Sequence, residues 1–338
     1  MDDHWQAFVL RHTGASAITH RQNVQTLWSG YGTLWKLRLA DGAFDSVVLK
    51  SIVLPDTETL GVSDQRSHPR GWGGRRSDLR KRSSYQIECE FYLRWATHCE
   101  SGCRVAKPIA IDSDRSGHRL LLEDLDAAGF ERRVRDPRPE EITAGLSWLA
   151  HFHATFLDRE PDRLWRRGTY WHLDTRPDEW SAMPDDHPLK IAAERLDQAL
   201  HRPTPQTIVH GDAKLGNFCF GDASPAVAAV DFQYVGGGCG MSDVAYFLGS
   251  CLMDDDLQPI ENDLLDQYFD RFASAADRMG HSKQVIDRTC RLWRGLFPVA
   301  WADFTRFLVG WSPGHPKLTG YSETLAKRAL DVLKRLDG

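Results

Sequence analysis

The sequence lacks the features that mark membrane, secreted and nucleic-acid-binding proteins. No apolar run reaches the length that crosses a bilayer, and the N-terminus carries neither a basic segment nor an apolar one, as a secretory leader would. The formal net charge is −5, whereas a nucleic-acid-binding domain is usually basic. We therefore expect a cytoplasmic protein with no membrane partner and no nucleic-acid partner.

Cysteine pairing signals are also missing. The seven cysteines are an odd number, and no CxxC pair occurs. Cys99 and Cys103 flank a short turn, but no second pair follows at zinc-finger spacing. We therefore predict reduced thiols, most of them buried. The 338 residues, 41% of them hydrophobic, are enough for one large domain or two ordinary ones.

The strongest chemical pattern lies in residues 210–220, HGDAKLGNFCF. Asp212 is followed by Asn217, and the apolar run 227–230 then ends at Asp231. Phosphoryl transfer needs one group that orients the acceptor hydroxyl and two oxygen ligands that hold Mg²⁺ against the phosphates. We predict Asp212 as the catalytic base and Asn217 with Asp231 as metal ligands. The alternative is a pair of Asx turns at strand ends.

The N-terminal third predicts antiparallel strands. Two β-rich pieces, 24–28 and 33–39, flank a hairpin that contains Gly30 and Gly32, and a third strand at 46–52 contains Lys50. These glycines would let the backbone approach phosphates, and Lys50 would pair with phosphate oxygens. The alternatives are an ordinary turn and a solvated lysine at a strand end.

Residues 66–82 form a basic, glycine-rich stretch that we expect to be a loop, serving either as a lid over phosphates or as a solvated connection. A helix is predicted over 83–96 with a serine cap, because apolar residues recur there every four positions. One of its glutamates, Glu88 or in reserve Glu90, would pair with Lys50.

A further hairpin is predicted from 105–111 and 119–125. In a kinase fold this segment is the hinge, where the backbone near Glu123 and Leu125 meets the adenine. We place the domain boundary near Asp126, giving an N-terminal lobe at 1–125 and a C-terminal lobe at 126–338.

Beyond the boundary the pattern is mostly helical. We predict helices at 139–156, 189–200, 244–249, 262–279, 281–296, 298–309 and 322–336. The glycine-rich residues 234–243 predict a flexible loop, with Ser242 and Asp243 capping the next helix. Asp243 has a second possible role in bracing the catalytic loop, and His153 is expected to hydrogen-bond neighbouring backbone.

A tryptophan-rich stripe runs along residues 293–311 at three- and four-residue steps. Such a stripe is usually core. With Asp303 beside it, part of the stripe could instead line an acceptor site, including one for a cation. We expect core for most of it, with one or two residues facing a substrate.

Several of these motifs occur in the order typical of one family. The segments LWSGYG, VVLK, SYQIECEFY, LLLEDL, HGDAKLGN, VDFQY and SDVAYFL resemble the aminoglycoside phosphotransferase/choline kinase superfamily, and most of all its ecdysteroid-kinase-like group and bacterial relatives. The match spans residues 23–250.

This resemblance implies an α+β, bilobal, protein-kinase-like fold. It has a small antiparallel β lobe with one main helix and a large, mostly helical C-terminal lobe. It also implies ATP and Mg²⁺ as cofactors and a small-molecule hydroxyl as acceptor. Carried over by position, Lys50 holds phosphates, Glu88 orients Lys50, and Asp212, Asn217 and Asp231 keep the roles given above.

The chain departs from protein kinases at Gln233, which stands where they have the glycine of DFG, and it lacks the arginine of their HRD motif. These differences argue against protein substrates. Lys214 lies inside the catalytic loop, where it could touch the transferring phosphate. The alternative function is a nucleotide-binding pseudokinase or ligand-binding module without turnover.

Overall fold

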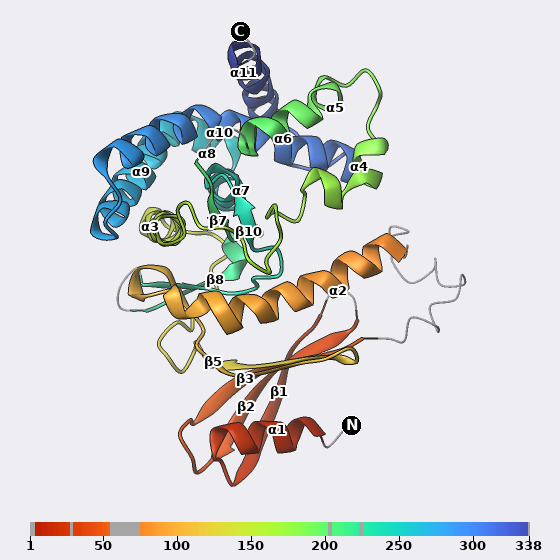
Figure 1. Cartoon of the computed structure of the whole chain (residues 1–338), viewed down its shortest axis with the longest axis vertical. Coiled ribbons are helices and arrows are strands. Elements are labelled where there is room, and N and C mark those ends of the chain that lie inside the picture. The colour runs from red at the N-terminus through yellow and green to blue at the C-terminus, as the bar shows by residue number, and fades with distance from the viewer. Residues whose placement is uncertain (1–3, 28–29, 55–74, 202–204, 223–225, 337–338) are drawn as a thin grey trace. The chain divides into compact units, whose positions relative to one another are not determined.

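The computed structural model describes residues 4–27, 30–54, 75–201, 205–222 and 226–336. The chain divides into two compact units (Figure 1). The first comprises Met1–His98 and Val105–Arg132, and the second comprises Cys99–Arg104 and Arg133–Gly338. Each unit is described separately below.

The first unit is built on a five-stranded sheet of antiparallel neighbours, in the order β1-β2-β3-β6-β5. Its strands are β1 (Ala17–Thr26), β2 (Gly32–Ala40), β3 (Ser46–Val53), β5 (Pro108–Ser113) and β6 (Gly117–Glu123). The predicted strands are therefore present. Strand β1 begins earlier than its apolar pattern indicated, because most of its residues are exposed and polar at the edge of the sheet.

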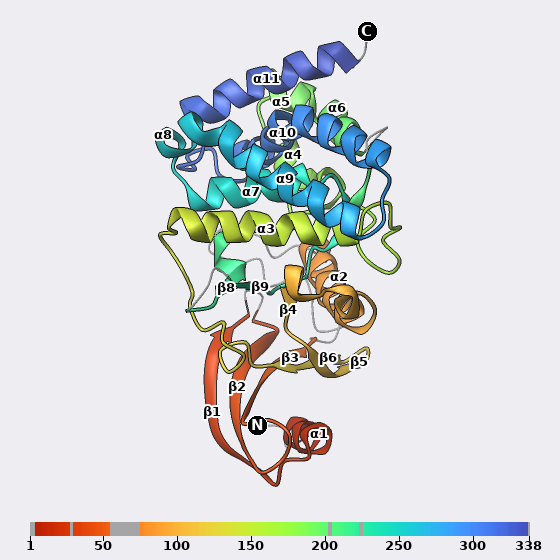
Figure 2. The ribbon, with the colours of Figure 1, turned by 90° about the vertical axis from the view of Figure 1, so that its left-hand side faces the viewer.

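Two helices lie on opposite faces of this sheet (Figures 1 and 2). Helix α1 (His4–Thr13) packs Trp5, Phe8 and Val9 against buried residues of the sheet such as Leu37 and Leu49. Helix α2 (Arg75–Glu90) lies on the other face and continues into the π-helical turn η1 (Phe91–Trp95) and the 3₁₀ turn η2 (Ala96–His98). Burial of apolar surface on both faces is what stabilises so small a sheet.

The start of α2 corrects one expectation. A loop was predicted through residue 82 and a helix from residue 83, but the helix begins at Arg75, so Ser83 is not its cap. Arginine, lysine and leucine are good helix formers. Asp78 also pairs with Arg82 one turn later, with Oδ2 2.8 Å from Nε. Residues 66–74 of the predicted basic stretch lie outside the described residues.

The second unit is mainly helical. Its helices are α3 (Pro139–Thr155), α4 (Pro177–Ser181), α5 (Pro188–Ile191), α6 (Ala193–His201), α7 (Met241–Cys251), α8 (Asp254–Leu257), α9 (Glu261–Arg278), α10 (Lys283–Trp311) and α11 (Gly320–Leu336). Short 3₁₀ turns are η3 (Ser101–Cys103), η4 (Leu173–Thr175), η5 (Leu215–Asn217) and η6 (Gln258–Ile260). Figure 2 shows α3, α9 and α10 stacked in layers, with α11 as the outermost helix.

Helix α10 corrects a second expectation. Two helices were predicted on either side of Pro298, but one helix of 29 residues runs through it. An interior proline removes a hydrogen bond and crowds the preceding turn, at a cost of about 3 kcal/mol. Trp293, Phe297 and Trp301 flank the proline and are almost fully buried, so packing on both sides offsets that cost.

Short strands position the site. Strand β7 (Thr207–Val209) pairs with β10 (Gly236–Gly238), and β8 (Phe218–Phe220) pairs with β9 (Val227–Ala229); β4 is Arg104–Val105. The glycine run was predicted to be a flexible loop, and that was wrong, because it forms buried strand β10. Glycine is needed there for close approach: a Cβ on Gly236 would lie 2.3 Å from the carbonyl oxygen of Trp165.

The predicted fold class is confirmed: the chain is an α+β protein with an antiparallel N-terminal sheet and a helical C-terminal region. Within the described residues, no helix combines the length and apolar character needed to cross a membrane.

Candidate active site

Lys50 lies in the middle of the first unit's sheet. It is on β3, opposite Leu34 of β2 and Leu120 of β6. Its Nζ is 2.6 Å from Oε2 of Glu88 on α2, and both side chains are buried. The choice left open between Glu88 and Glu90 is therefore resolved geometrically in favour of Glu88. A buried ammonium requires such a partner, and the pair fixes where the lysine points.

Glu90 faces a different side of α2 and pairs with Arg94, with Oε2 2.7 Å from Nε. The two glutamates thus have different partners, because residues two positions apart on a helix face different sides.

The glycine hairpin between β1 and β2 is closed by backbone hydrogen bonds. The amide of Gly30 donates to Leu27 at 2.8 Å, and the amide of Leu27 donates to Gly32 at 2.8 Å. Gly30 has a φ of 69°, in the left-handed region that glycine adopts without strain. The Tyr31 hydroxyl donates to Asp78 of α2 at 2.6 Å, which ties the hairpin to the helix.

Glu123 and Leu125, the predicted adenine contacts, lie at the end of β6 and just after it. The Glu123 amide already donates to the Lys107 carbonyl at 2.9 Å, while the Leu125 carbonyl accepts from Phe130 at 2.8 Å. Between them, buried Asp124 accepts from the Ser46 hydroxyl at 2.6 Å. The segment is therefore fixed to the sheet.

In the second unit, β7 leads directly into the loop that carries Asp212. His210 at the start of this loop is fully buried, with Nε2 3.0 Å from the Val230 carbonyl and Nδ1 accepting from the Asp212 amide at 3.3 Å. The tautomer with its proton on Nε2 satisfies both contacts. Asp212 Oδ2 accepts from Lys214 Nζ at 2.8 Å and from Asn217 Nδ2 at 3.0 Å.

The second carboxylate oxygen of Asp212, Oδ1, is buried without a hydrogen-bond partner among the described residues. Burial, together with the nearby charge of Asp231, raises the pKa of Asp212, although the Lys214 ammonium opposes this shift. Burial alone would lower the pKa of Lys214, but the Asp212 carboxylate raises it, and the net shift is upward. The loop thus holds a desolvated carboxylate beside a second carboxylate.

Asn217 and Asp231 supply oxygen donors close to Asp212. The Val230 amide donates to the Asn217 carbonyl at 3.0 Å, which joins the end of β9 to the catalytic loop. Asp231 has a φ of 71°, an uncommon backbone state for a residue other than glycine, and it accepts from Gln233 Nε2 at 2.6 Å.

This donor set fits Mg²⁺. Carboxylate and amide oxygens are the ligands that this ion takes in proteins. The partnerless Oδ1 of Asp212, and the pKa increase that Asp231 contributes to, are the features that a nearby cation would relieve.

A buried network braces the catalytic loop from behind. The Asp243 carboxylate accepts from the amides of His210 at 2.6 Å and Gly211 at 2.9 Å, and it lies 3.1 Å from His153 Nε2. His153 Nδ1 lies 2.8 Å from the Tyr268 hydroxyl. Asp243 therefore braces the catalytic loop by accepting hydrogen bonds from two of its backbone amides.

Two expectations about this network were wrong. Ser242 and Asp243 do not cap α7, because the helix already begins at Met241. The His153 ring contacts two side chains rather than backbone. Both errors arise because the sequence does not show that Asp243 lies against the catalytic loop, where buried backbone amides need acceptors, or that His153 lies beside Asp243.

A sequence profile described as "Phosphotransferase enzyme family" matches residues 25–279. The chain belongs to this family. It is accordingly a phosphotransferase of the type that acts on hydroxyl acceptors. No curated protein matches the chain.

Solved structures support the phosphotransferase fold. A proposed aminoglycoside phosphotransferase from Ralstonia eutropha is 14% identical, with a TM-score of 0.51 over 98% of this chain and 95% of the other. An amicoumacin kinase in complex with AMP-PNP, Ca²⁺ and amicoumacin is 16% identical, with a TM-score of 0.50 over 99% of this chain and 96% of the other. At these identities the similarity establishes the fold alone.

Sequence reasoning missed two residues of this phosphotransferase, one in each unit. Tyr246 of α7 is close enough for the Asp212 carboxylate to add to the rise in its pKa, which burial dominates. Its position in an apolar helical segment gave no signal beyond core. Asp78, which anchors the glycine hairpin, lies in a stretch that was expected to be loop.

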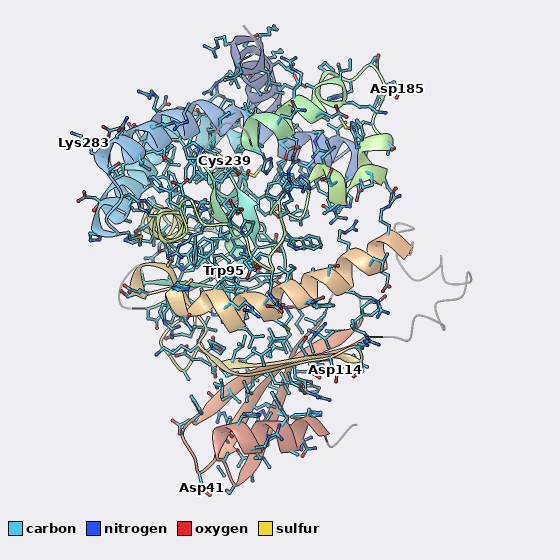
Figure 3. All side chains as sticks on the ribbon, viewed as in Figure 1. Asp41, Trp95, Asp114, Asp185, Cys239 and Lys283 are labelled. Carbon is cyan, nitrogen blue, oxygen red and sulfur yellow. The ribbon has the colours of Figure 1, made fainter. Side chains whose placement is uncertain are left out.

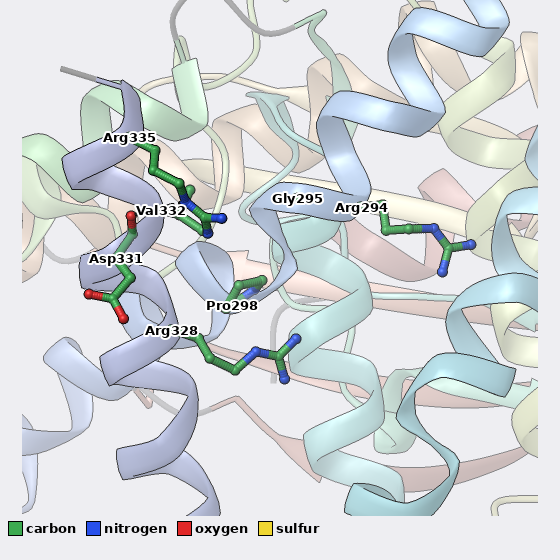
Figure 4. A pocket seen from close by; sticks show the side chains of 7 residues that line it. All are labelled: Arg294, Gly295, Pro298, Arg328, Asp331, Val332 and Arg335. Atoms are coloured by element: carbon green, nitrogen blue, oxygen red, sulfur yellow. Dashed lines mark hydrogen bonds between the residues drawn. The ribbon is translucent and has the colours of Figure 1, made fainter. Parts of the chain in front are cut away.

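A surface pocket of about 270 Å³ lies elsewhere in the second unit, between α10 and α11 (Figure 4). It is lined by Arg294, Gly295, Pro298, Arg328, Asp331, Val332 and Arg335. Two of its arginines are already paired, Arg294 with Asp266 and Arg328 with Glu261. None of the predicted site residues lines this pocket.

Proposed function

We propose that the chain is an ATP-dependent small-molecule kinase that transfers the γ-phosphate of ATP to a hydroxyl group of a small acceptor. The observation that supports this most directly is the Asp212 loop: a buried carboxylate with one partnerless oxygen, next to Asn217 and Asp231. A structural carboxylate would have its hydrogen bonds satisfied, whereas one that receives a proton from a substrate needs an open oxygen.

In the proposed reaction the acceptor oxygen forms a bond to the γ-phosphorus, while the bond from that phosphorus to the bridging oxygen of ADP breaks. Asp212 accepts the hydroxyl proton. Lys214, whose side chain is 44% exposed, would stabilise charge on the transferring group. Lys50, oriented by Glu88, would pair with phosphate oxygens of ATP.

Asn217 and Asp231 would hold Mg²⁺, which when bound neutralises phosphate charge. Gly30 and Gly32 would let the hairpin backbone approach the phosphates. The backbone at Glu123 and Leu125 would meet the adenine. The Leu125 amide, which donates to no described residue, suits that role.

We also propose an N-terminal lobe of residues 1–125 and a C-terminal lobe of residues 126–338, membership of the ecdysteroid-kinase-like group, and a cytoplasmic location. The order of the motifs along the chain supports the group, and seven free cysteines support a reducing compartment.

The alternative is a pseudokinase that binds nucleotide without turnover. It would need no base, so the desolvated carboxylate of Asp212 would have no purpose in it. The joint presence of Lys50, Asp212, Asn217 and Asp231 therefore favours the active enzyme.

The test is incubation of the full chain with MgATP and pooled small alcohols, followed by ³¹P NMR for a new phosphate monoester. The proposal predicts a monoester and ADP in equal amounts from at least one pool. ADP formed with inorganic phosphate alone would show hydrolysis rather than transfer, and binding of ATP without either product across the pools would favour the pseudokinase.

A further inference from the structure

An aromatic cluster in the second unit extends from Asp212. Its buried members are Trp171, Tyr246, Phe304, Phe307 and Leu308, with partly buried Tyr170, Trp311 and Leu318 packed against them. The Tyr170 and Tyr246 hydroxyls are 3.2 Å apart. After burial, the charge of Asp212 is among the causes that raise the pKa of both tyrosines. The Tyr170 amide also donates to the carbonyl of Gly211, the residue before Asp212, at 3.0 Å. The aromatic cluster therefore lies against the loop that carries the proposed base.

Lys317, from the segment between α10 and α11, lies over the same aromatic cluster. Its Nζ is 5.8 Å from the centre of the Tyr246 ring and 6.0 Å from that of Phe304. Burial lowers the pKa of this lysine, against the opposing effects of Cys251 and Asp254. Among the described residues, no carboxylate lies within ion-pair distance of it. A half-buried ammonium without a counter-ion costs free energy that an anionic ligand would recover.

Apart from Asp212 itself, two carboxylates near the aromatic cluster, Asp303 and Asp254, are in the opposite situation, because each already has a partner. Asp303 accepts from Trp171 Nε1 at 3.0 Å and from Arg306 Nη2 at 2.9 Å. Asp254 accepts from the hydroxyl of Thr319. Asp303 and Asp254 therefore leave little for a cationic group of an acceptor to bind at the Lys317 end of the aromatic cluster.

Arg176 is a second cation over the aromatic cluster, 5.8 Å from the centre of the Tyr170 ring and 5.4 Å from that of Phe307. Its guanidinium pairs with Glu179 at 3.1 Å and donates from Nε to the Tyr170 carbonyl at 2.8 Å. Arg176 is therefore already neutralised, which distinguishes it from Lys317.

We propose that the acceptor is an anionic alcohol, whose ring-sized apolar body packs on the aromatic cluster while its hydroxyl meets Asp212 and its carboxylate pairs with Lys317. This inference rests on the proposed kinase function. Tyr246 lies between the two groups, because its hydroxyl interacts with Asp212 and its ring lies beneath Lys317. A polycationic amino-alcohol would instead meet an unpaired lysine.

Three matched probes test this: 4-(hydroxymethyl)benzoate, its neutral benzamide and its cationic benzylamine. They share one hydroxymethyl group and one ring, and they differ in the para substituent, which is anionic, neutral or cationic. Binding to the full chain is measured calorimetrically without nucleotide, and kcat/KM is measured with MgATP. We expect the benzoate to exceed the benzylamine by roughly tenfold to a hundredfold in both measurements, the range for one hydrogen bond to a charged group.

Variants at position 317 identify the residue responsible. Lys317→Gln should reduce affinity for the benzoate by roughly tenfold or more and leave the benzamide almost unchanged. Lys317→Glu should shift the preference toward the benzylamine. Lys283→Gln is the matched control, because Lys283 is exposed at the start of α10 (Figure 3) and should have no effect. Lys317→Met retains the apolar stem if the other variants fold poorly.

Equal binding of the three probes, or a charge preference that survives Lys317→Gln, would overturn the inference. Failure of all three probes to bind, where MgATP still stabilises the chain, overturns the acceptor class and leaves the kinase function standing. Benzoate binding that depends on Lys317, in a chain that MgATP does not stabilise, supports the anion site and counts against the kinase function.

Discussion

The two units differ in whether their charged groups already have partners. In the first unit, Lys50 and Glu88 form a buried ion pair that is complete without a ligand. In the second unit, Asp212 keeps one oxygen without a partner, and Asp231 helps to raise its pKa. The first site is a stable, pre-oriented contact for a phosphate, whereas the second is costly until a cation and a substrate arrive.

This difference has a simple physical interpretation. A side chain that only has to point in one direction is best fixed by a partner, as Glu88 fixes Lys50. A side chain that has to accept a proton or face a cation must keep an oxygen available, and the protein bears that cost in stability. Changes in the two units should therefore separate stability from turnover.

The largest expected effect is on turnover. Asp212→Asn removes the proposed base, and we expect kcat to fall by roughly a hundredfold or more. The measurement is monoester formation under saturating MgATP and acceptor. Normal transfer by this variant would show that Asp212 is not the base.

The next effect is on stability and concerns the first unit. Lys50→Met leaves Glu88 buried without its partner, so we expect the free energy of unfolding to fall by about 3–5 kcal/mol. The measurement is denaturant unfolding.

The double variant Lys50→Met/Glu88→Leu is the control for this change. It should recover most of the lost stability while the apparent affinity for ATP stays low, because the phosphate contact is still missing. If the double variant is as unstable as the single one, the loss arises from packing rather than from the stranded charge.

A smaller effect is expected behind the catalytic loop. Asp243→Asn weakens the bonds to the His210 and Gly211 amides, and we expect a loss of about 1–3 kcal/mol in the free energy of unfolding, with a lower kcat. Loss of stability without any change in kcat would mean that Asp243 supports the fold but does not position Asp212.

The smallest effect is the pH dependence of stability. Because the pKa of Asp212 is raised by burial, the folded chain binds this proton more tightly than the unfolded chain does. Its contribution to stability is therefore full below the unfolded pKa of about 3.9 and is lost as pH rises through the folded pKa. Without Mg²⁺, Asp212→Asn should be more stable than the wild type near neutral pH by about 1 kcal/mol, and this difference should vanish in acid.

Asp185→Asn is the matched control, since the Asp185 side chain is fully exposed (Figure 3). It should give no gain in stability at neutral pH. A gain at Asp185 equal to that at Asp212 would attribute the effect to net charge rather than to burial.

The sequence predicted those parts of the fold that have a regular local pattern. The alternating strands around Lys50 and the long helix at 139–156 follow from periodicity and turn residues, and both are present. It failed where tertiary packing overrides local preference. Pro298 remains inside α10 because its neighbours are buried, and residues 236–238 form a strand because the Trp165 backbone lies against them.

The candidate site shows the same division. Spacing identified Asp212 and Asn217, and the structure joins them by a hydrogen bond. The sequence could not decide between Glu88 and Glu90, because both lie on one helix and only the position of the sheet decides which faces Lys50. Nor could the sequence identify Lys317, because its significance depends on which aromatic rings the fold brings beneath it.

The most direct test of the central claim is thermal unfolding of the wild type and Asp231→Asn, each with ATP alone and with MgATP. The account predicts that Mg²⁺ adds to the stabilisation by ATP in the wild type, raising Tm by several degrees at nucleotide concentrations of about a hundred times Kd, and that most of this increment disappears in Asp231→Asn. No stabilisation by MgATP at millimolar concentration, or an undiminished Mg²⁺ increment in Asp231→Asn, would contradict it.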